Sequence, residues 1–527
     1  MPDAPTVQTA QVLAERYGPA YRWLVTVTGM TGVVSMVLAM TTVNVAVPDV
    51  MGAFGIGQDK AQWMSSAYMA TMTAGMLINA WLTGIFGERR VFVGALFFFS
   101  AGALLGGSAP TEDALIFARV LQGFSAGVAQ PLVMATIFTV FPPERRGMAM
   151  GVFGLGVVFA PAIGPTLGGL MIEYFSWRYV FFISLPFCVV AAGLGLLFMP
   201  TRRIPRQIPP FDWLGFALLC VALFGLMTGI ADGQREGWAS DTIVLRLAGG
   251  ALAGVAFVLW ELRTPRALLD VRIFANVEFS AAAMIAFIFG AGMMGSTYII
   301  PVFVQTIIGF TPLLAGLMMM PAGLMLAVIF PLAGRLSDAM PASLMIIGGL
   351  LLFALGFVWM VSADVNTTFW TLVAMIMVSR LGLGFINPSL NASSLKALPA
   401  DKVRQGSGVA NFMRQLGGAF GINLMVAFFE IRTRFHADAL TATQSWDNQT
   451  TQRLLHQVER LLQHAGLPYQ QQKAMALDYL GTIVNLNAQI MAFSDTFIVV
   501  GAVALIALIP AAMLSRSQRR ARRLAFG

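Results

Sequence analysis

The chain has 527 residues, of which 57% are hydrophobic and 11% are charged. Soluble globular proteins carry about 25% charged residues, so this composition excludes an ordinary soluble domain and indicates that the main solvent is the lipid bilayer. Backbone polar groups need partners inside lipid, and the apolar runs are long and continuous. They therefore predict an all-α polytopic membrane protein and exclude a barrel of short alternating strands. The net charge of +8 is spread over short loops, which makes nucleic-acid binding the poorer interpretation.

A polar N-terminal segment, residues 1–22, lacks the pattern of a cleavable signal peptide and leads directly into a full-length apolar run. A helical span needs about 20 apolar residues, and by this measure the sequence predicts fourteen spans. Their approximate limits are 23–47, 62–86, 91–109, 114–140, 148–173, 179–199, 213–231, 242–261, 279–308, 311–334, 342–361, 369–392, 406–430 and 490–514.

The distribution of arginine and lysine predicts the orientation of the spans, because cytoplasmic loops are enriched in both. With the N-terminus in the cytoplasm, most of the 33 basic residues fall in cytoplasmic segments, including 88–90, 142–146, 200–207 and the tail 515–527. The short outer loops hold Lys60, Arg178 and Arg235. This bias predicts that both termini are cytoplasmic.

The long outer segment is residues 431–489. Within it, "QRLLHQVERLLQ" (452–463) places Leu455, Val458 and Leu462 on one helical face. Two interpretations stay open: a helical hairpin that rests on its own membrane domain, and a docking surface for a periplasmic partner.

The two halves of the chain share a pattern. "RVLQGF" begins at Arg119 in the predicted fourth span, and "RLGLGF" begins at Arg380 in the twelfth. An arginine repeated at equivalent places indicates duplicated bundles around a central site, as in many secondary transporters. The predicted domains are a six-helix bundle (23–199), a cytoplasmic linker (200–212), an inserted helix pair (213–261), a second linker (262–278) and a C-terminal six-helix bundle (279–514).

Seven short segments carry a family likeness: "TTVNVAVP" (41–48), "AWLTGIFGERR" (80–90), "RVLQG" (119–123), "APAIGPTLGG" (160–169), "SWRYVFFISLP" (176–186), "YIIPVFVQTIIGFTPLLAG" (298–316) and "NFMRQLGG" (411–418). In this order they resemble the major facilitator superfamily, in its fourteen-span drug:proton antiporter branch, with EmrB/QacA-like multidrug exporters as the nearest likeness.

The resemblance implies the major facilitator fold, with two six-helix bundles and two inserted helices, in the cell inner membrane. It implies secondary-active export of small amphipathic compounds by alternating access, in exchange for protons. It also implies that the outer loop meets a periplasmic membrane-fusion protein, which continues the route to an outer-membrane channel.

The chain departs from this family at a position that bears on mechanism. Ala39 stands where the family usually has an aspartate in the first span. Gly84 replaces a second aspartate, which EmrB-type proteins also tend to lack, whereas Asp338 keeps an acid at the equivalent loop of the second repeat. Without the first aspartate, the charge of Arg119 loses its usual partner, which favours weak acids and anionic amphiphiles over lipophilic cations.

Arg119 lies about 9 Å inside the outer end of its span, at about 1.5 Å per residue. Asn44 has a similar depth, and Gln122 lies one turn from Arg119 on the same helix. Arg119 is either structural, donating to Asn44, Gln122 and carbonyls near Pro48, or it faces a central cavity and receives an anionic or proton-linked group. Ionisable residues inside spans usually mark such a pathway.

Arg380 and Arg414 form the corresponding pair in the second bundle. Arg414, which is close to Asn411, either snorkels to the cytoplasmic interface or joins the pathway. Other candidate pathway residues, which either line an adaptable cavity or pack against lipid, are Tyr68, Gln305, Tyr298, Asn387 and the methionines at 318–320.

Proton coupling needs a group that titrates, and no acid lies near a predicted span centre. Asp232, Glu430 and Asp495 lie at outer span ends and are either proton sites or solvated interfacial residues. A third possibility is that the substrate carries the proton.

Two further motifs are candidates for conformational roles. Gly87 allows a sharp turn after which Arg89 and Arg90 either form a latch with helix carbonyls and acids or simply hold the loop in the cytoplasm. The predicted fifth span is a close-packed, bendable helix because it contains several glycines and prolines, among them Gly164, Pro165, Gly168 and Gly169.

The sequence contains no pattern that predicts an enzyme, a metal site or a cofactor. Cys188 and Cys220 lie in apolar runs, and the three histidines lie far apart in one polar stretch. The alternatives are an exporter of one metabolite or siderophore without the usual proton coupling, and a non-transporting membrane receptor or scaffold.

Overall fold

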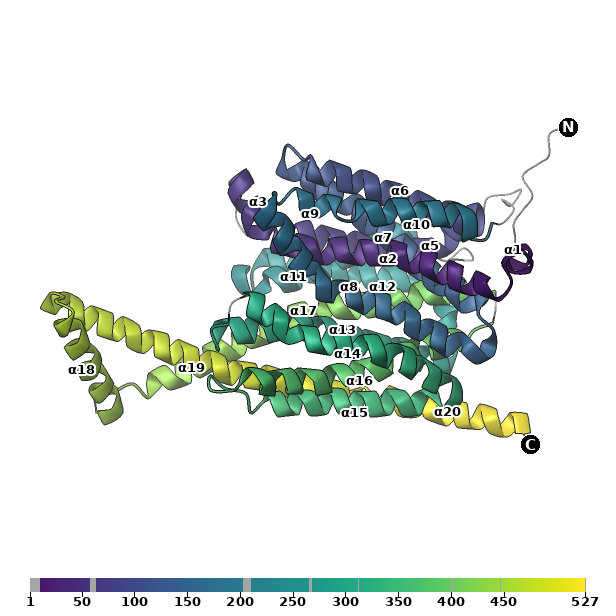
Figure 1. Ribbon diagram of the computed structural model, residues 1–527. Helices are drawn as coiled ribbons and strands as arrows, with labels where there is room; N and C mark the ends of the chain where they lie inside the picture. Colours follow the sequence, from purple (N-terminus) through teal and green to yellow (C-terminus); the bar gives the residue numbers. More distant parts are fainter. Residues whose placement is uncertain are drawn as a thin grey trace.

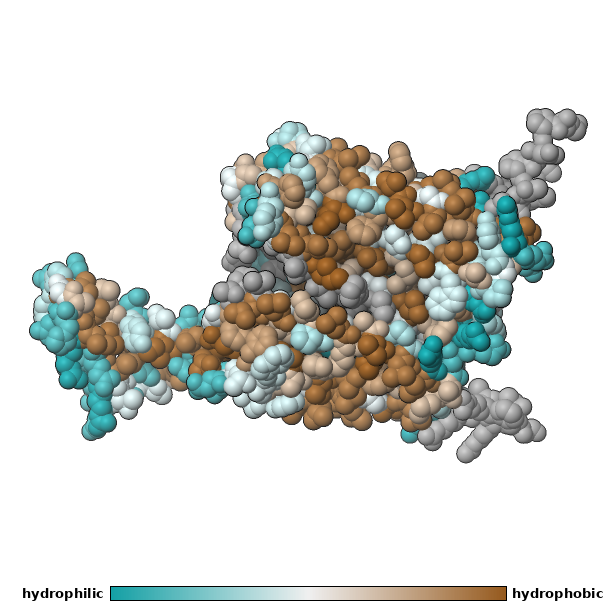
Figure 2. Space-filling view, viewed as in Figure 1, coloured by the Kyte–Doolittle hydropathy of each residue, from teal (hydrophilic) through white to brown (hydrophobic). Residues whose placement is uncertain are grey.

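The computed structural model describes residues 10–56, 63–201, 210–264, 268–310, 312–399, 401–445 and 447–526, and all regular structure in these ranges is helical. This confirms the prediction of an all-α protein. Figure 1 shows the helices running side by side in a bundle, with a hairpin that projects from one end. Apolar side chains cover most of the visible face of the bundle in Figure 2, as expected for a surface in contact with lipid.

Six of the predicted spans form the N-terminal lobe. Its helices are α2 (Tyr21–Val45), α5 (Trp63–Phe86), α6 (Glu88–Gly107), α7 (Glu112–Val140), α8 (Arg146–Tyr174) and α10 (Leu185–Phe198), which follows the short α9 (Tyr179–Phe182). The helix α7 lies at the centre, against α2, α5 and α6. It begins where the Thr111 hydroxyl accepts a hydrogen bond from the N–H of Ala114, and it ends before Pro142.

The C-terminal lobe repeats this plan. Its helices are α13 (Val277–Thr306), α14 (Pro312–Ala339), α15 (Ala342–Met360), α16 (Phe369–Lys396), α17 (Val403–Ala442), α19 (Tyr469–Ile506) and α20 (Leu508–Phe526). The helix α17 packs on α13 and α19, and α16 packs on α14 and α15. The two lobes meet where α8 packs against α14 and α17 packs against α5 and α7.

Between the lobes in the sequence lie α11 (Trp213–Glu236) and α12 (Asp241–Arg263). They pack mainly on each other, while α11 also contacts α5 and α17. Only 22% of the most apolar stretch of α12 is buried, so most of this helix faces the lipid. The short helix η3 (Val271–Ala275) then leads to α13.

In the described part of the chain, 13 helices are long and apolar enough to cross a membrane. The predicted fifth span is not among these 13; it forms the 29-residue helix α8, which lies between α2 and α14. The predicted sixth span is not one continuous helix, because it is divided into α9 and α10 just before Pro186, which occupies the first turn of α10.

The long outer segment continues the membrane helices. The helix α17 extends to Ala442, α19 begins at Tyr469, and α18 (Gln449–His464) packs against α19 at the tip. The prediction of a helix at 452–463 is confirmed, but the interpretation of a hairpin resting on the membrane domain is wrong. Figure 1 shows the hairpin projecting away from both lobes, because its two stems are straight continuations of spanning helices.

The bundle therefore has two distinct ends. We call the end that carries α18 the hairpin end, and the end that carries Arg89, Arg145 and the C-terminus the basic end. One buried apolar cluster crosses between the lobes in the basic half and includes Met134 and Phe138 of α7 together with Leu395 and Val409 of the C-terminal lobe. A separate cluster at the hairpin end belongs to the N-terminal lobe alone.

Candidate functional site

Arg119 is fully buried in the centre of the N-terminal lobe. Its Nε donates a hydrogen bond to the Met64 carbonyl at 2.9 Å, and its Nη1 donates to Gln122 Oε1 at 3.0 Å and to the Ala39 carbonyl at 3.5 Å. The contact with Gln122 agrees with the structural interpretation. The predicted carbonyls near Pro48 do not serve as acceptors, because α5 passes closer and offers Met64.

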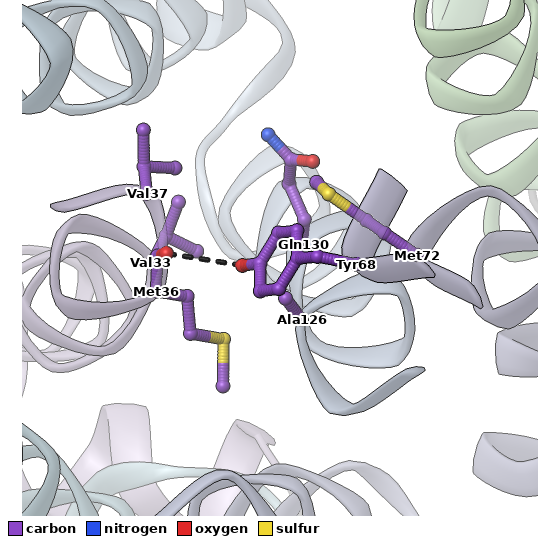
Figure 3. Close-up of a pocket in the computed structure, with 7 residues that line it drawn as sticks. All are labelled: Val33, Met36, Val37, Tyr68, Met72, Ala126 and Gln130. Carbon is purple, nitrogen blue, oxygen red and sulfur yellow. Dashed lines mark hydrogen bonds between the residues drawn. The ribbon is translucent and has the colours of Figure 1, made fainter. Parts of the chain in front are cut away.

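Tyr68 supports Arg119 from α5. The guanidinium carbon lies 4.3 Å from the centre of the Tyr68 ring, which places a cation over an aromatic face. The Tyr68 hydroxyl donates to the Met36 carbonyl at 3.0 Å, as Figure 3 shows. Tyr68 and Gln130 line a cavity of about 10 Å³, which is at the lower limit for a single water. In this conformation the cavity beside Tyr68 is therefore too small to hold a substrate next to Arg119.

The site of Arg119 leaves buried polar atoms without partners. Within the described residues, Arg119 Nη2, Gln122 Nε2 and Gln130 Oε1 have no hydrogen-bond partner. The first two are donors on side chains that contact each other, so the pair lacks an acceptor. No carboxylate of the described residues forms an ion pair with Arg119. Ala39, at the position of the missing aspartate, contributes only its carbonyl. The side chain of Asn44 lies outside the described part of the structure.

Arg380 occupies the equivalent place in the C-terminal lobe and is 6% exposed. It donates to the hydroxyls of Ser296 at 2.9 Å and Thr297 at 3.4 Å, both on α13. Its described partners are therefore uncharged, as they are for Arg119. Asn387 lies two turns further along α16, where its Oδ1 accepts from Asn391 at 2.8 Å and its Nδ2 has no partner.

Arg414 is buried in α17 rather than exposed at the membrane interface. It is 9% exposed and donates to Asn411 Oδ1 at 2.5 Å. Asn411 in turn lies 2.9 Å from Met134 Sδ across the lobe boundary. The snorkelling interpretation of Arg414 is therefore wrong, because the interior of the lobe holds the guanidinium.

Several of the candidate residues do not join this site. Gln305 is exposed near the hairpin end of α13, and Tyr298 is 44% exposed. Asp232 forms an ion pair with Arg246 at 2.7 Å within the inserted pair. Asp495 pairs with Arg432 and lies 2.7 Å from His436 at the base of the hairpin.

The basic end contains a contact between the lobes. Both oxygens of Asp338, at the end of α14, accept from the first turn of α8: Oδ1 from the N–H of Gly147 at 2.7 Å and Oδ2 from the N–H of Met148 at 3.0 Å. A carboxylate at a helix N-terminus is stabilised by the free N–H groups and the helix dipole. A Cβ added at Gly334 would lie 2.6 Å from the Gly147 carbonyl, so the two helices touch through their backbones.

The turn before α6 has the geometry that its sequence predicts. Gly87 has φ of +79°, which favours glycine. Arg89 Nε donates to the Met199 carbonyl at the end of α10 at 2.7 Å, whereas Arg90 is exposed. This contact lies within the N-terminal lobe, so it ties α6 to α10 and does not join the lobes.

The glycine-rich helix α8 packs on both of its neighbours. Near the hairpin end, Gly164 and Gly168 lie against Thr41 and Thr42 of α2. Gly169 has open space beside it, and the side chain of Pro165 lies outside the described part. Near the basic end, α8 packs on α14.

Two buried acids, Asp212 and Glu261, lie at the basic end of the inserted pair and were not among the predicted site residues. They lie at helix ends, 49 positions apart in sequence, where acids are usually solvated. The signal that could have found them is "FDW" immediately before one apolar run and "WEL" at the end of the next.

Two helical lobes that each enclose buried arginine, and that meet through glycine-rich helices, are typical of a membrane transport protein of the secondary type. A family model described as Major Facilitator Superfamily matches residues 12–422. The chain belongs to the Major Facilitator Superfamily, is multi-pass, and is a transporter rather than an enzyme.

Curated relatives cover most of the chain. It is 29% identical to the "Uncharacterized MFS-type transporter YhcA" of Bacillus subtilis, over 89% of this chain and 88% of that protein. It is 28% identical to the "Multidrug export protein EmrB" of Haemophilus influenzae, over 80% and 84%. It is 25% identical to the "Fatty acid resistance protein FarB" of Neisseria gonorrhoeae, over 95% and 97%. These relatives confirm the resemblance to the fourteen-span drug:proton antiporter branch.

A solved structure has the same fold. The human organic anion transporter MFSD10 (TETRAN) superposes with a TM-score of 0.62, covering 94% of this chain and 99% of that one at 13% identity. At this identity the likeness concerns the fold alone, and it agrees with the predicted major facilitator architecture.

Proposed function

We propose that the protein exports small amphipathic compounds, with weak acids favoured, across the cell inner membrane. The pair of donors on α7 that lacks an acceptor carries this proposal. Arg119 Nη2 and Gln122 Nε2 are buried without partners in the described structure, beside a guanidinium that no described carboxylate neutralises. Buried charge without a counter-ion is costly, so an anionic group that enters this site is favoured.

Arg380 supplies a second buried positive charge, in the C-terminal lobe. Arg380 is held by two hydroxyls, which orient the guanidinium and leave its charge intact. When the lobes separate and expose the arginines, a carboxylate or sulfonate that enters between them would be attracted by both guanidinium groups. A lipophilic cation would be repelled at the same place. The name of the FarB relative, which concerns fatty acid resistance, agrees with an amphipathic acid as cargo.

Export by alternating access follows from the two-lobe plan. Asp338 and the apolar cluster at Met134 and Val409 close the basic half in this conformation. The bias of arginine and lysine supports assigning the basic end, with both termini, to the cytoplasm. Loading of cargo then requires α8 to separate from α14 and α17 to separate from α5, which exposes the arginines to the cytoplasm.

Protons are the proposed driving ion, by antiport. Ala39 replaces the usual acid of the first span, so either another acid of the chain carries the proton inward or coupling involves the ionisable proton of the substrate itself. This same residue favours a second candidate: an exporter of one metabolite or siderophore without the usual proton coupling. Proton release on addition of substrate to the purified protein distinguishes the two, since only antiport by protein groups predicts it.

The projecting hairpin is the proposed docking surface for a periplasmic membrane-fusion protein that leads to an outer-membrane channel. Between α18 and α19 lies a groove of about 540 Å³ lined by polar and charged residues with one tyrosine, namely His456, Glu459, Arg460, Gln463, Tyr469 and Gln472. Figure 2 shows the tip as largely hydrophilic, which suits a partner protein in the aqueous phase better than it suits lipid.

The test of the proposed function is resistance in cells with and without the gene. A panel of weak-acid toxins and matched lipophilic cations is compared, first with the wild type and then with Arg119→Ala at equal protein levels. We expect the gene to raise resistance to the weak acids and the variant to lose this effect. Equal protection against both classes, or unchanged protection in the variant, would contradict the preference for acids.

A further inference from the structure

A second buried polar cluster lies at the basic end of the inserted pair, far along the chain from either arginine. Asp212 precedes α11 and is 9% exposed. Its Oδ1 accepts the N–H of Gly215 at 2.9 Å, and its two oxygens accept the indole N–H of Trp260 at 3.0 and 2.9 Å. Both oxygens of Asp212 are therefore already occupied by donors.

Glu261, in the last turn of α12, is only 3% exposed. Its Oε2 accepts the backbone N–H of Leu269 at 3.1 Å, which ties the following linker to the helix. Its Oε1 is buried and has no hydrogen-bond partner in the described part of the chain. A buried acid with one bonded and one orphaned oxygen needs an explanation.

The orphaned oxygen faces Asp212. A Cβ added at Gly215 would lie 2.5 Å from Asp212 Oδ2 and 2.6 Å from Glu261 Oε1, so both oxygens border the same small volume. Glycine at 215 leaves that volume free. Asp212 Oδ2 and the unpaired Oε1 of Glu261 therefore lie near each other.

Within the described residues, no cation forms an ion pair with Glu261. The described charged groups that act on it from the neighbouring elements are two acids, Asp212 and Asp270. Asp270 is paired with Lys402 at 2.8 Å, and Arg263 and Arg272 are exposed. Two buried carboxylates side by side are strongly unfavourable. One proton on Glu261 Oε1 removes the repulsion.

We propose that Asp212 and Glu261 form a proton-binding site, in which Glu261 holds the proton on its orphaned oxygen beside the carboxyl group of Asp212. A metal ion is the poorer ligand for this cluster. Calcium needs about 6 to 8 oxygen ligands, and Trp260 and Gly215 already occupy the oxygens of Asp212. The proposal does not depend on the identity of the cargo.

The proton site is connected to the closure of the basic end. Glu261 binds the N–H of Leu269, and the next residue, Asp270, binds Lys402 immediately before α17. In α17, the Ser407 hydroxyl donates to the Pro131 carbonyl of the N-terminal lobe at 3.1 Å. Loss of the proton charges Glu261 beside Asp212, and the repulsion loosens the linker that holds the start of α17.

The first test is infrared difference spectroscopy on the purified full-length protein as the pH is raised. We expect the wild type to lose the carbonyl band of a buried protonated carboxyl group, and Glu261→Gln to lack this band. Glu144→Gln, which alters an exposed acid at the same end, should keep it. Identical spectra of the wild type and Glu261→Gln at every pH would overturn the proposal, as would a band change that requires sodium or magnesium.

A second variant keeps the proposal testable if Glu261→Gln does not fold. Asp212→Asn preserves a good helix N-cap but removes the acidic neighbour, so the carbonyl band of Glu261 should disappear at lower pH than in the wild type. An unchanged titration would overturn the pairing. Loosening of the linker is measured by amide hydrogen exchange of residues 268–271. At high pH their exchange rate in the wild type should rise by more than the intrinsic effect of pH. In Glu261→Gln the rate should follow the intrinsic effect alone.

Discussion

Asp338 of α14 accepts the backbone N–H of Gly147 in α8 at 2.7 Å, and this bond joins the two lobes at the basic end. The carboxylate caps a helix that belongs to the opposite lobe, so its charge and the α8 dipole attract each other only when the end is closed. Lys396, 3.8 Å from the same carboxylate, adds a weaker contact within the C-terminal lobe. Besides the buried apolar cluster, one acid that accepts two N–H groups therefore holds the basic end closed.

Asp338→Asn should weaken this closure. The charge–dipole interaction is worth up to about 2 kcal/mol, so the ratio of open to closed molecules should rise by up to about thirty-fold. Spin labels at Glu144→Cys and Met340→Cys, on either side of the contact, report it as a longer distance component. Asp364→Asn, on an exposed loop of the C-terminal lobe, is the control. Identical distance distributions for both variants would contradict the role of Asp338.

Gly334→Ala should prevent closure by steric contact. The added Cβ would lie 2.6 Å from the Gly147 carbonyl, and a backbone atom cannot turn aside as a side chain can. The same spin labels should show the open distance as the main component, with transport strongly reduced. Gly316→Ala lies in the same helix with open space beside it, so it should behave as the wild type. If both substitutions were tolerated equally, α8 and α14 would not need close contact.

Tyr68 should contribute to stability in two separable ways. Tyr68→Phe removes the hydrogen bond to the Met36 carbonyl, at a cost of about 1 kcal/mol, but keeps the ring under Arg119. Tyr68→Leu also removes the cation–π contact, which is worth about 2 kcal/mol in a desolvated site. Thermal unfolding in detergent should therefore give the highest melting temperature for the wild type, a lower one for Tyr68→Phe and the lowest for Tyr68→Leu. Equal melting temperatures for Tyr68→Phe and Tyr68→Leu would contradict a cation–π role.

The long apolar runs predicted most of the fold because each spanning helix must satisfy its own backbone. The fourth span, expected at 114–140, is α7 at Glu112–Val140. The reach of the hairpin was not predictable from hydropathy, since α17 continues past Phe429 into polar sequence without a break. Only tertiary packing decides whether such a polar helix lies on the lobes or projects from them.

The contacts of the site that lie within one helix could be predicted from the sequence, whereas the contacts between helices could not. Arg119 and Gln122 are close because they are three positions apart on one helix, and this spacing can be read directly from the sequence. The acceptors Met64 and Ala39 come from other helices, and their distances depend on packing that no periodicity encodes. The pair Asp212 and Glu261 was missed for the same reason.

Removal of the hairpin tip should separate transport from assembly. Replacing Gln449–His464, the whole of α18, with a short flexible linker leaves the two stems in place. Reconstituted protein should still move substrate, while resistance in cells should fall if a partner binds the tip. The groove variant Tyr469→Ala, which is 82% exposed and packs on neither lobe, should reproduce the loss in cells. Full resistance after removal of α18 would contradict the docking proposal.

The preference of the buried arginines for an anion is tested most directly by equilibrium binding to the purified protein. A fatty acid and an alkylammonium of equal chain length are titrated into the wild type, Arg119→Ala and Arg380→Ala. A charge-assisted hydrogen bond is worth about 1.5 to 3 kcal/mol, so each substitution should weaken fatty-acid binding by about tenfold or more and leave the alkylammonium unchanged or tighter. Equal affinity of the wild type for both amphiphiles, with no loss in either variant, would contradict the account.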